Sequence, residues 1–171
     1  KHQGKIKHIG LCNTNIEELE KSKEIERIEV VQSEFNFFQH SLADSLFPYL
    51  KENQISFMSW GTLDKGILTG RVDELRKFES SDCRSWAPWW KKSDNQLKFE
   101  AMRRIRPQLD KFHYTGLELA LAFNLSFPEV SVALCGVRNT AQLHSLFKAL
   151  ENPPPKKLQD ELLELAKSTQ K

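Results

Sequence analysis

The sequence predicts an α/β protein in which parallel strands alternate with helices. Short apolar runs alternate with amphipathic segments along the chain, which is the pattern of strand–helix units around a parallel sheet. Four such units follow one another without interruption, and an amphipathic segment ends the chain. A barrel and a short doubly wound sheet share this periodicity, so the pattern alone leaves the choice between them open.

The strands are predicted from four apolar runs. They cover residues 6–11, 28–35, 55–60 and 130–135. Nearly every residue of the fourth run is apolar, which is typical of a strand that is buried on both faces. We therefore expect residues 130–135 to lie inside the fold.

Caps and a proline indicate where the first helices begin. Asn15 stands three residues before Glu18, the spacing of a capping box, and opens a charged helix that runs to about residue 25. Pro48 falls near the middle of a helical segment at about 41–53, where it predicts a kink or a late start. Two further helices are expected at about residues 95–112 and 116–125.

The end of the chain carries two more helices. Asn139 caps a predicted helix at 140–150. Three prolines, at positions 153–155, then begin a terminal helix. Its apolar stripe has helical spacing and consists of Leu158, Leu162, Leu165 and Ala166.

A long connection of about residues 61–93 separates the third strand from the next helix. It exceeds the usual length of a connection, and long ordered loops in barrels are often functional. It contains an aromatic cluster, Trp86, Trp89 and Trp90.

Length and composition restrict the possible classes of protein. The chain has 171 residues, enough for one domain, whereas a complete (β/α)8 barrel needs about 250. A formal net charge of +2 gives no reason to expect a nucleic acid partner. No apolar run reaches the ~18 residues of a membrane span, and the N-terminus has no signal peptide pattern. The chain does not begin with Met, so we expect a fragment or a processed chain.

Cysteine usage indicates a reducing compartment. Cys12, Cys83 and Cys135 are few, widely spaced and odd in number. That pattern favours neither a disulfide framework nor a zinc site, and we expect no metal. A cytoplasmic location is therefore predicted.

Four phrases at the predicted strand ends resemble those of the aldo-keto reductases. Residues 4–13 read GKIKHIGLCN, residues 31–36 VQSEFN, residues 60–70 WGTLDKGILTG and residues 135–142 CGVRNTAQ. The corresponding family phrases are GKIRxIGxSN, VQxEYN, YSPLxRGLLTG and xGxRNxxQ. All four occur in the order of the family and at about its spacing, and the similarity extends from residue 4 to about residue 150.

This resemblance implies a particular α/β fold, half of a TIM (β/α)8 barrel made of four βα units plus a C-terminal helix. The strands would be the fifth to eighth of the family barrel. Residues 1–152 would form the half-barrel, and residues 153–171 a terminal helix packed on it. The carboxyl ends of the strands would then carry the functional site.

For the nicotinamide end of a cofactor, the resemblance implies three residues. Asn13 and Gln32 match the family's partners of the nicotinamide carboxamide, and their amides offer the paired donors and acceptors that this group requires. Trp60 stands where the family stacks an aromatic ring on the nicotinamide. Judged without the resemblance, the same residues suit a turn, a satisfied polar strand position and a core tryptophan.

The phosphate groups of the cofactor are implied to bind at two other phrases. Gly61, Leu63 and Lys65 match the loop that passes along the pyrophosphate, where backbone amides and one cation are suitable. Asp64 is an acidic neighbour for a phosphate and weakens this part of the match.

Arg138 matches the arginine that pairs with the 2′-phosphate, and its guanidinium fork favours NADP (NADPH) over NAD. Gly136 allows the backbone to approach closely. Gln142 matches an adenosine contact, although its spacing from Asn139 also suits a capping box. Leu146 replaces the Asn that the family often has, which puts the adenine contact in question.

No catalytic residue can be carried over from the family. Its Tyr, Lys, Asp and His lie on the first half of the barrel, and neither Tyr49 nor Tyr114 falls at a strand end. Trp86 and Trp89 lie in the loop that covers the substrate mouth in the family, and are predicted as a hydrophobic lid. The alternative for these two residues is a packing or interface role.

Three hypotheses on function follow. In the first, the chain is the cofactor-binding half of an NADPH-dependent aldo-keto reductase that interconverts small-molecule carbonyls and alcohols by hydride transfer, and is not competent alone. In the second, it is a non-catalytic NADP-binding module, and in the third a half-barrel that only associates with itself. A half-barrel exposes open sheet edges. The missing N-terminal half, a second copy, or the tryptophans with the terminal helix are the candidate covers.

Overall fold

A computed structural model describes residues 1–91 and 95–169 of the chain. Within these residues the strands are β1 (Gly10–Cys12), β2 (Val30–Glu34), β3 (Ser56–Trp60) and β4 (Val130–Ala133). The helices are α1 (Ile16–Lys23), α2 (Leu42–Ser45), α3 (Phe47–Glu52), α4 (Pro88–Lys91), α5 (Gln96–Lys111), α6 (Gly116–Leu125), α7 (Thr140–Glu151) and α8 (Lys156–Lys167). Two short 3₁₀ helices, η1 (Asp64–Thr69) and η2 (Cys83–Ser85), lie between β3 and α4.

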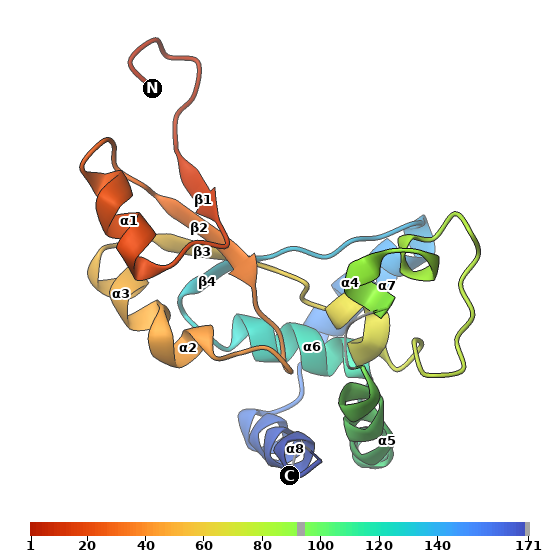
Figure 1. Cartoon of the computed structure of the whole chain (residues 1–171). Helices are drawn as coiled ribbons and strands as arrows, with labels where there is room; N and C mark the ends of the chain where they lie inside the picture. Colours follow the sequence, from red (N-terminus) through yellow and green to blue (C-terminus); the bar gives the residue numbers. More distant parts are fainter. Residues whose placement is uncertain (92–94, 170–171) are drawn as a thin grey trace.

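The described strands form one parallel sheet in the order β1-β2-β3-β4. Strands adjacent in the chain are therefore adjacent in the sheet, as in one arc of a barrel, and both β1 and β4 are edges (Figure 1). Val31 pairs with Phe57, and Gln32 pairs with Met58. Since side chains alternate along a strand, Val31 and Phe57 share one face of the sheet and Gln32 and Met58 share the other.

The core lies on the face of the sheet that the helices cover. It is rich in phenylalanine: Phe35 packs against Phe47 with ring centroids 4.9 Å apart, and Phe37 packs against Phe123 at 5.2 Å. The rings meet tilted or edge to face, the arrangement that aromatic quadrupoles favour. This cluster packs the connection after β2 against α3 and α6, and it thereby holds these two helices against the sheet.

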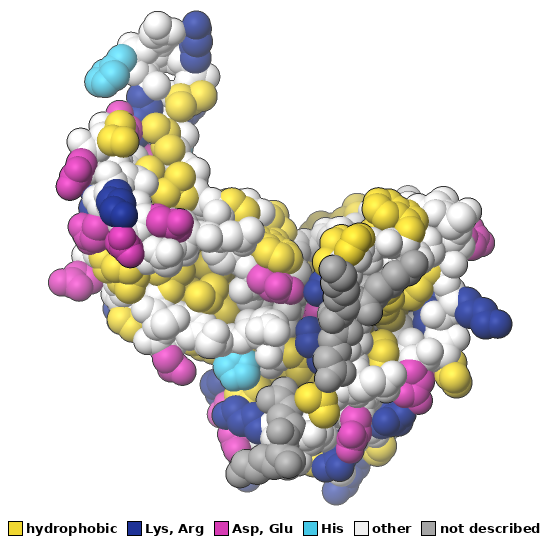
Figure 2. Space-filling model, viewed as in Figure 1, with side chains coloured by type: hydrophobic (Ala, Val, Ile, Leu, Met, Phe, Trp, Pro, Cys, Tyr) yellow, Lys and Arg dark blue, Asp and Glu magenta, His cyan; other side chains and the backbone are white. Residues whose placement is uncertain are grey.

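The opposite face of the sheet is open. In the view of Figure 2 the surface is hollowed between the end that carries the N-terminus and the part that carries α4. A hollow of about 290 Å³ on this face is lined by residues of the first three strands, including Cys12, Gln32 and Met58. Polar and apolar side chains of the strands are thus accessible from one side.

The prediction that residues 130–135 are buried was wrong. Only Val130 of β4 is buried, and Val132 is 41% exposed. The reason is that β4 is an edge strand, which pairs only with β3 within the described residues. An apolar run is typical of a strand that is packed between other elements, but its side chains are buried only where such elements are present.

The first predicted strand begins later than expected. Residues 2–8 are exposed, and β1 starts only at Gly10. A strand needs a ladder partner along its whole length, and Gly10 already pairs with Val30, the first residue of β2. The preceding residues extend away from the sheet (Figure 1).

Most helix predictions were confirmed. Asn15 and Glu18 form the expected capping box at α1. The segment at 41–53 is divided into α2 and α3 at Leu46, with Pro48 in the first turn of α3, where a missing N–H costs nothing. Asn139 caps α7 through its side-chain oxygen.

The loop and the terminal helix are also as expected in outline. The connection after β3 contains η1, η2 and α4, while Ser93, its expected end, lies outside the described residues. The helix α8 buries Leu158, Leu162 and Ala166 and packs against α5. It lies at the opposite end of the molecule from β1 (Figure 1), so it does not cover that edge of the sheet.

Candidate cofactor site

The four phrases of the sequence meet at one end of the sheet. The strands are parallel, so their carboxyl ends lie at one edge of the sheet. Glu34 and Trp60 end β2 and β3, and Asn13 and the segment at 134–139 follow β1 and β4. In open or barrel-like parallel sheets this edge is where ligands bind. The topology therefore brings together residues that are far apart in the chain.

At the centre of this edge, Trp60 and Asn13 are in direct contact. The indole Nε1 of Trp60 donates a hydrogen bond of 2.9 Å to Oδ1 of Asn13, and the backbone N–H of Asn13 donates to the carbonyl of Gln32 at 2.8 Å. Asn13 has a positive φ of 53°, a conformation that Asn tolerates better than most residues. Gln32 is two residues before Glu34, which pairs with Trp60, so Gln32 and Trp60 share the open face.

The turn after β3 has an unusual backbone. Asp64, Lys65 and Gly66 follow one another with positive φ, and Gly61 also has a φ of 69°. Asn36 holds the start of the turn, because its side chain is fully buried and donates to the carbonyl of Gly61 at 3.0 Å. The Oδ1 atom of Asn36 accepts from two backbone N–H groups, so both the nitrogen and the oxygen of this amide have a partner.

Charges in the turn are arranged so that the acid points inward. Asp64 is fully buried, and Nζ of Lys98 lies 2.7 Å from its Oδ2. Lys65 lies between three groups: Nζ is 3.8 Å from Glu34, 3.8 Å from Asp64, and 5.6 Å from the ring centroid of Trp89. Because Lys98 balances Asp64, the acid is less of an obstacle to an anion at Lys65 than the sequence suggested. Leu63, within this turn, packs partly buried against the core.

The segment after β4 presents backbone and one cation. A Cβ added at Gly136 would meet no atom within 4 Å, so space is open beside this residue. Gln142 accepts a hydrogen bond of 2.7 Å from the backbone N–H of Arg138, and donates its own backbone N–H to Asn139. The side chain of Gln142 therefore accepts from the N–H of Arg138, whereas the expected capping box would have it accept from the N–H of Asn139.

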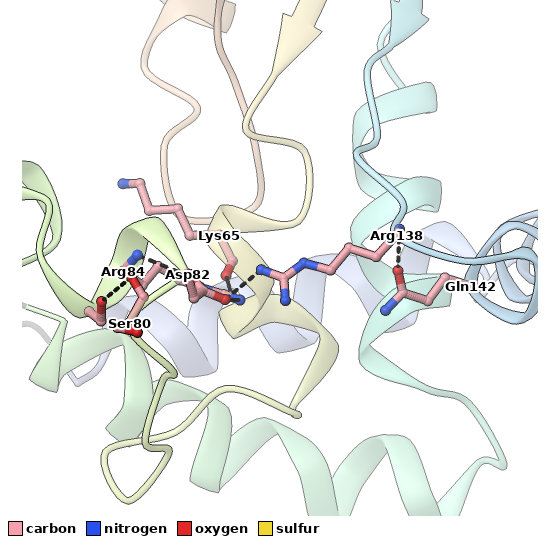
Figure 3. Close-up of polar contacts among 7 residues, drawn as sticks. Lys65, Ser80, Asp82, Arg84, Arg138 and Gln142 are labelled. Carbon is pink, nitrogen blue, oxygen red and sulfur yellow. Dashed lines mark hydrogen bonds and ion pairs between the residues drawn. The ribbon is translucent and has the colours of Figure 1, made fainter.

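Arg138 is paired in this structure with an acid from the loop after β3. One guanidinium nitrogen of Arg138 donates to Oδ2 of Asp82, which lies 56 positions earlier in the chain (Figure 3). Asp82 also accepts from Nε of Arg84 at 2.9 Å and from its terminal nitrogen at 2.7 Å. The hydrogen bonds from Arg84 and then Arg138 hold the pKa of Asp82 well below its usual range. The remaining terminal nitrogen of Arg84 donates to the carbonyl of Lys65 at 2.7 Å.

Sequence reasoning missed Asp82, Arg84 and the role of Asn36. Asp82 and Arg84 stand in a loop without periodicity, and the only local signal is an Asp at the cap of the short helix η2. They belong to the site because Asp82 pairs with Arg138, and a local sequence pattern does not indicate a contact over this distance in the chain. Asn36 lies in one of the four phrases, but its bond to Gly61 depends on the tertiary fold.

The tryptophans of the loop do not act as one cluster. Trp86 and Trp89 are exposed, whereas Trp90 packs edge to face on Phe78 at 5.5 Å. Trp89 lies beside Lys65, and thus near the candidate site. Neither Trp86 nor Trp89 is buried against a sheet edge.

The described residues offer few alternatives elsewhere. Tyr49 lies in α3 and donates to Glu20, and Tyr114 lies between α5 and α6, so neither described tyrosine is at a strand end. No group of His, Cys, Asp or Glu with the arrangement of a metal site occurs in residues 1–91 and 95–169. Across the same residues, no helix has the length and hydropathy that a membrane span requires.

Comparison with known proteins identifies the family. Residues 1–166 match the sequence profile of the Aldo/keto reductase family. The chain is 32% identical over 148 residues to the aldo-keto reductase YhdN of Bacillus subtilis, an alignment that covers 84% of this chain and 44% of that protein. The protein therefore belongs to the aldo/keto reductase family.

Other relatives show the same partial coverage. The chain is 24% identical to an aldo-keto reductase of Schizosaccharomyces pombe whose name specifies NADP(+), with 86% of this chain and 44% of that protein covered. It is 28% identical to a probable voltage-gated potassium channel β subunit of Arabidopsis thaliana, over 73% of this chain and 39% of that protein. The chain thus spans less than half the length of these curated relatives.

A solved structure supports the fold. The glycerol dehydrogenase of Gluconobacter oxydans superposes with a TM-score of 0.79 at 21% identity, covering 96% of this chain and 50% of that one. The α/β fold with its parallel sheet thus matches about half of an aldo-keto reductase barrel, as the sequence predicted.

Proposed function

We propose that this chain is the cofactor-binding half of an NADPH-dependent aldo-keto reductase, and that it binds NADP(H) along the carboxyl edge of its sheet. The observation that carries the proposal is the contact between Trp60 and Asn13, with Gln32 beside them on the open face. Three residues that lie on or just after three different strands, all implied by the family resemblance to bind the nicotinamide, lie together.

At the nicotinamide end, these residues would orient the ring. The amides of Asn13 and Gln32 supply the donors and acceptors that a carboxamide needs. The ring of Trp60 offers a flat face for stacking, and its bond to Asn13 restrains the ring plane. When bound, the nicotinamide of NADPH would supply the hydride for a carbonyl substrate, while this half of the protein binds and orients the cofactor.

At the phosphate end, the available groups fit a dinucleotide. The pyrophosphate would lie along the turn of Gly61, Leu63 and Lys65, where Lys65 adds a cation. The backbone N–H groups of Asp64 and Gly66 are already used within the turn. The 2′-phosphate would lie on Arg138, beside the open space at Gly136 and the start of α7 with Gln142. A guanidinium suits a phosphate better than a ribose hydroxyl, which favours NADP over NAD.

The substrate, the partner and the cellular location are also part of this proposal. A small-molecule carbonyl would enter over the open face. Trp86 and Trp89, which are exposed, are proposed as its apolar lid, and Trp89 lies beside Lys65. The relatives are about twice as long as this chain, and β1 and β4 are open edges, so a further half-barrel is the partner expected to complete the barrel and to carry the catalytic groups. A second copy of the chain is the alternative cover. We expect the protein to work in the cytoplasm.

Calorimetric titration with NADPH tests the proposal. We expect one site per chain, with NADPH bound more tightly than NADH. Absence of binding to both cofactors would overturn the proposal and leave the self-associating half-barrel. In that case sedimentation would show a dimer whose formation is independent of cofactor.

A non-catalytic NADP-binding module is the second candidate. It is favoured by the similarity to a probable voltage-gated potassium channel β subunit. Turnover separates the two. If the chain supplemented with the first half of a related barrel oxidises NADPH in the presence of an aldehyde, it is an enzyme half. Cofactor binding without any turnover would favour the module.

A further inference from the structure

The pair formed by Asp82 and Arg138 has a consequence for cofactor selectivity, if the site binds NADP as proposed. Arg138 is the residue to which the 2′-phosphate is assigned, yet in this structure its guanidinium is occupied by a carboxylate (Figure 3). Only one nitrogen of the guanidinium is engaged, and the Arg138 side chain is 66% exposed. Asp82, in contrast, is only 6% exposed.

Asp82 does not depend on Arg138. Both of its oxygens are engaged by Arg84: Oδ1 accepts from Nε and from the backbone N–H, and Oδ2 accepts from a terminal nitrogen. Release of Arg138 therefore leaves no buried carboxylate without a partner, which is the situation that would be costly. The bond between Arg138 and Asp82 is thus one that can open.

Arg138 does not depend on Asp82 either. Its backbone is held by Gln142, which accepts from its N–H, and by the cap that Asn139 forms on α7. The position of Arg138 at the start of the helix is therefore fixed by local hydrogen bonds. These bonds hold the backbone of Arg138 without Asp82, and the carboxylate of Asp82 neutralises part of the charge that a phosphate would meet.

We propose that Asp82 is an exchangeable counter-ion of Arg138 and a determinant of cofactor selectivity. NADP, with its 2′-phosphate, has to displace Asp82 from the guanidinium, whereas NAD leaves the pair intact. Asp82 therefore weakens the binding of NADP alone and reduces the preference for NADP over NAD. After displacement Asp82 stays on Arg84, whose link to the carbonyl of Lys65 keeps the pyrophosphate turn in place.

Asp82→Asn tests this role. Asn retains an Oδ1 that accepts from the backbone N–H of Arg84, so the cap of η2 survives the change. We expect calorimetry to show NADPH bound about 2- to 5-fold more tightly, the range of one exposed ion pair, with NADH unchanged. Asp82→Ser, which also retains a capping oxygen, should shift NADPH affinity in the same direction.

Two controls isolate the contact. Glu79→Gln removes one negative charge from the same loop, within electrostatic range of Arg138 but without a hydrogen bond to it, and should have a clearly smaller effect. In an Arg138→Ala background, Asp82→Asn should no longer change NADPH affinity. If it still tightened binding there, the freed Arg84 would be the cause and the exchange would be disproved.

Other outcomes also decide the question. Weaker NADPH binding by Asp82→Asn would mean that Asp82 positions Arg138, which overturns the counter-ion role while leaving the proposed function intact. Equal changes for NADPH and NADH would show that Asp82 acts on the loop as a whole and would also overturn it. If the unmodified protein bound neither cofactor, the proposed function would fail, and the counter-ion role with it.

Discussion

The side chains of Trp60 and Asn13 are joined by a 2.9 Å hydrogen bond although 47 positions separate them in the sequence. Asn13 follows β1 and Trp60 ends β3, so the bond passes over the end of β2, the strand that carries Gln32. A ring restrained in this way offers one face to a ligand. This relationship leads to the first prediction.

Trp60→Phe should preserve cofactor binding, whereas Trp60→Ala should weaken it. Phe keeps an aromatic face but cannot donate to Asn13, so we expect an affinity for NADPH within a few-fold of the unmodified protein. Loss of the ring in the Ala variant should cost about 3- to 10-fold, the range of an aromatic stacking contact. Calorimetry measures both values.

Fluorescence provides an independent readout for the same residue. Both variants should lose most of the quenching of tryptophan emission by bound NADPH, provided that the ring of Trp60 stacks on the nicotinamide. Trp86→Phe serves as the control, since it removes an exposed indole elsewhere in the chain. Undiminished quenching in Trp60→Ala would exclude the stacking role.

Arg138→Ala should weaken NADPH binding by about 10- to 100-fold and leave NADH nearly unchanged. The reason is that a hydrogen bond to a charged group contributes about 1.5–3 kcal/mol, and only NADPH carries the 2′-phosphate. The matched control is Arg104→Ala, which removes an exposed arginine paired with Glu100 on α5. Equal weakening for both cofactors would remove the assignment of Arg138 to the 2′-phosphate.

The acid stability of the fold should depend on Glu29. The backbone N–H of Ile9 and then Nζ of Lys1 donate to its carboxylate at 2.9 and 2.6 Å, which lowers the pKa of Glu29 from 4.5 to about 2. Because the folded-state pKa is depressed, Glu29 stabilises the fold above pH ~4.5, and this contribution disappears as the pH falls toward ~2.

Glu29→Gln should therefore be less stable than the unmodified protein at neutral pH, and the difference should vanish near pH 2. Urea unfolding followed at several pH values measures it. Glu24→Gln, at an exposed position just after α1, should show little difference throughout. A destabilisation of Glu29→Gln that is the same at every pH would contradict the ionic role.

Two glycines should respond oppositely to alanine. A Cβ at Gly116 would lie 2.0 Å from the carbonyl oxygen of Leu68, so Gly116→Ala should force α6 away from the turn after β3 and destabilise the protein by about 1–3 kcal/mol. At Gly136 a Cβ meets nothing, and Gly136→Ala should leave the unfolding midpoint unchanged. Thermal unfolding tests both.

The same pair of variants also examines the phosphate site. If the backbone approaches the cofactor at Gly136, Gly136→Ala should reduce NADPH affinity without any loss of stability. Affinity equal to that of the unmodified protein would remove Gly136 from the site. Unaltered stability of Gly116→Ala would show that the contact between α6 and the turn is looser than described.

The helix α7 carries an apolar stripe that a partner should cover. Leu143, Phe147 and Leu150 recur at helical spacing and are exposed, Phe147 by 62%. Phe147→Glu should reduce association in sedimentation experiments, with either a further half-barrel or a second copy, because it places a charge on this stripe. The unfolding midpoint should stay nearly the same.

The control for this prediction is Leu75→Glu, an apolar and even more exposed position in the loop after β3. It should leave association unchanged. Association unaffected by Phe147→Glu would mean that α7 faces solvent in the assembled protein.

The sequence alone was sufficient for the order of the strands and of the longer helices, although not for the short helices η1, η2 and α4. Its caps located α1 and α7, because hydrogen bonds between a side chain and nearby backbone N–H groups depend only on local spacing. The approximate bounds predicted for α6, 116–125, agree with Gly116–Leu125. It also predicted the family, since four phrases in one order are a specific signal.

Only the tertiary structure decided which surfaces are covered and which charges are paired. Burial of β4 depends on an element opposite its inner face, and the sequence of a strand does not record whether that element is present. The pairing of Asp82 with Arg138 joins two loops that the parallel sheet brings to the same edge. Such contacts join residues that are far apart in the sequence. Local patterns indicate only which residues are neighbours within a turn of helix or a few strand positions.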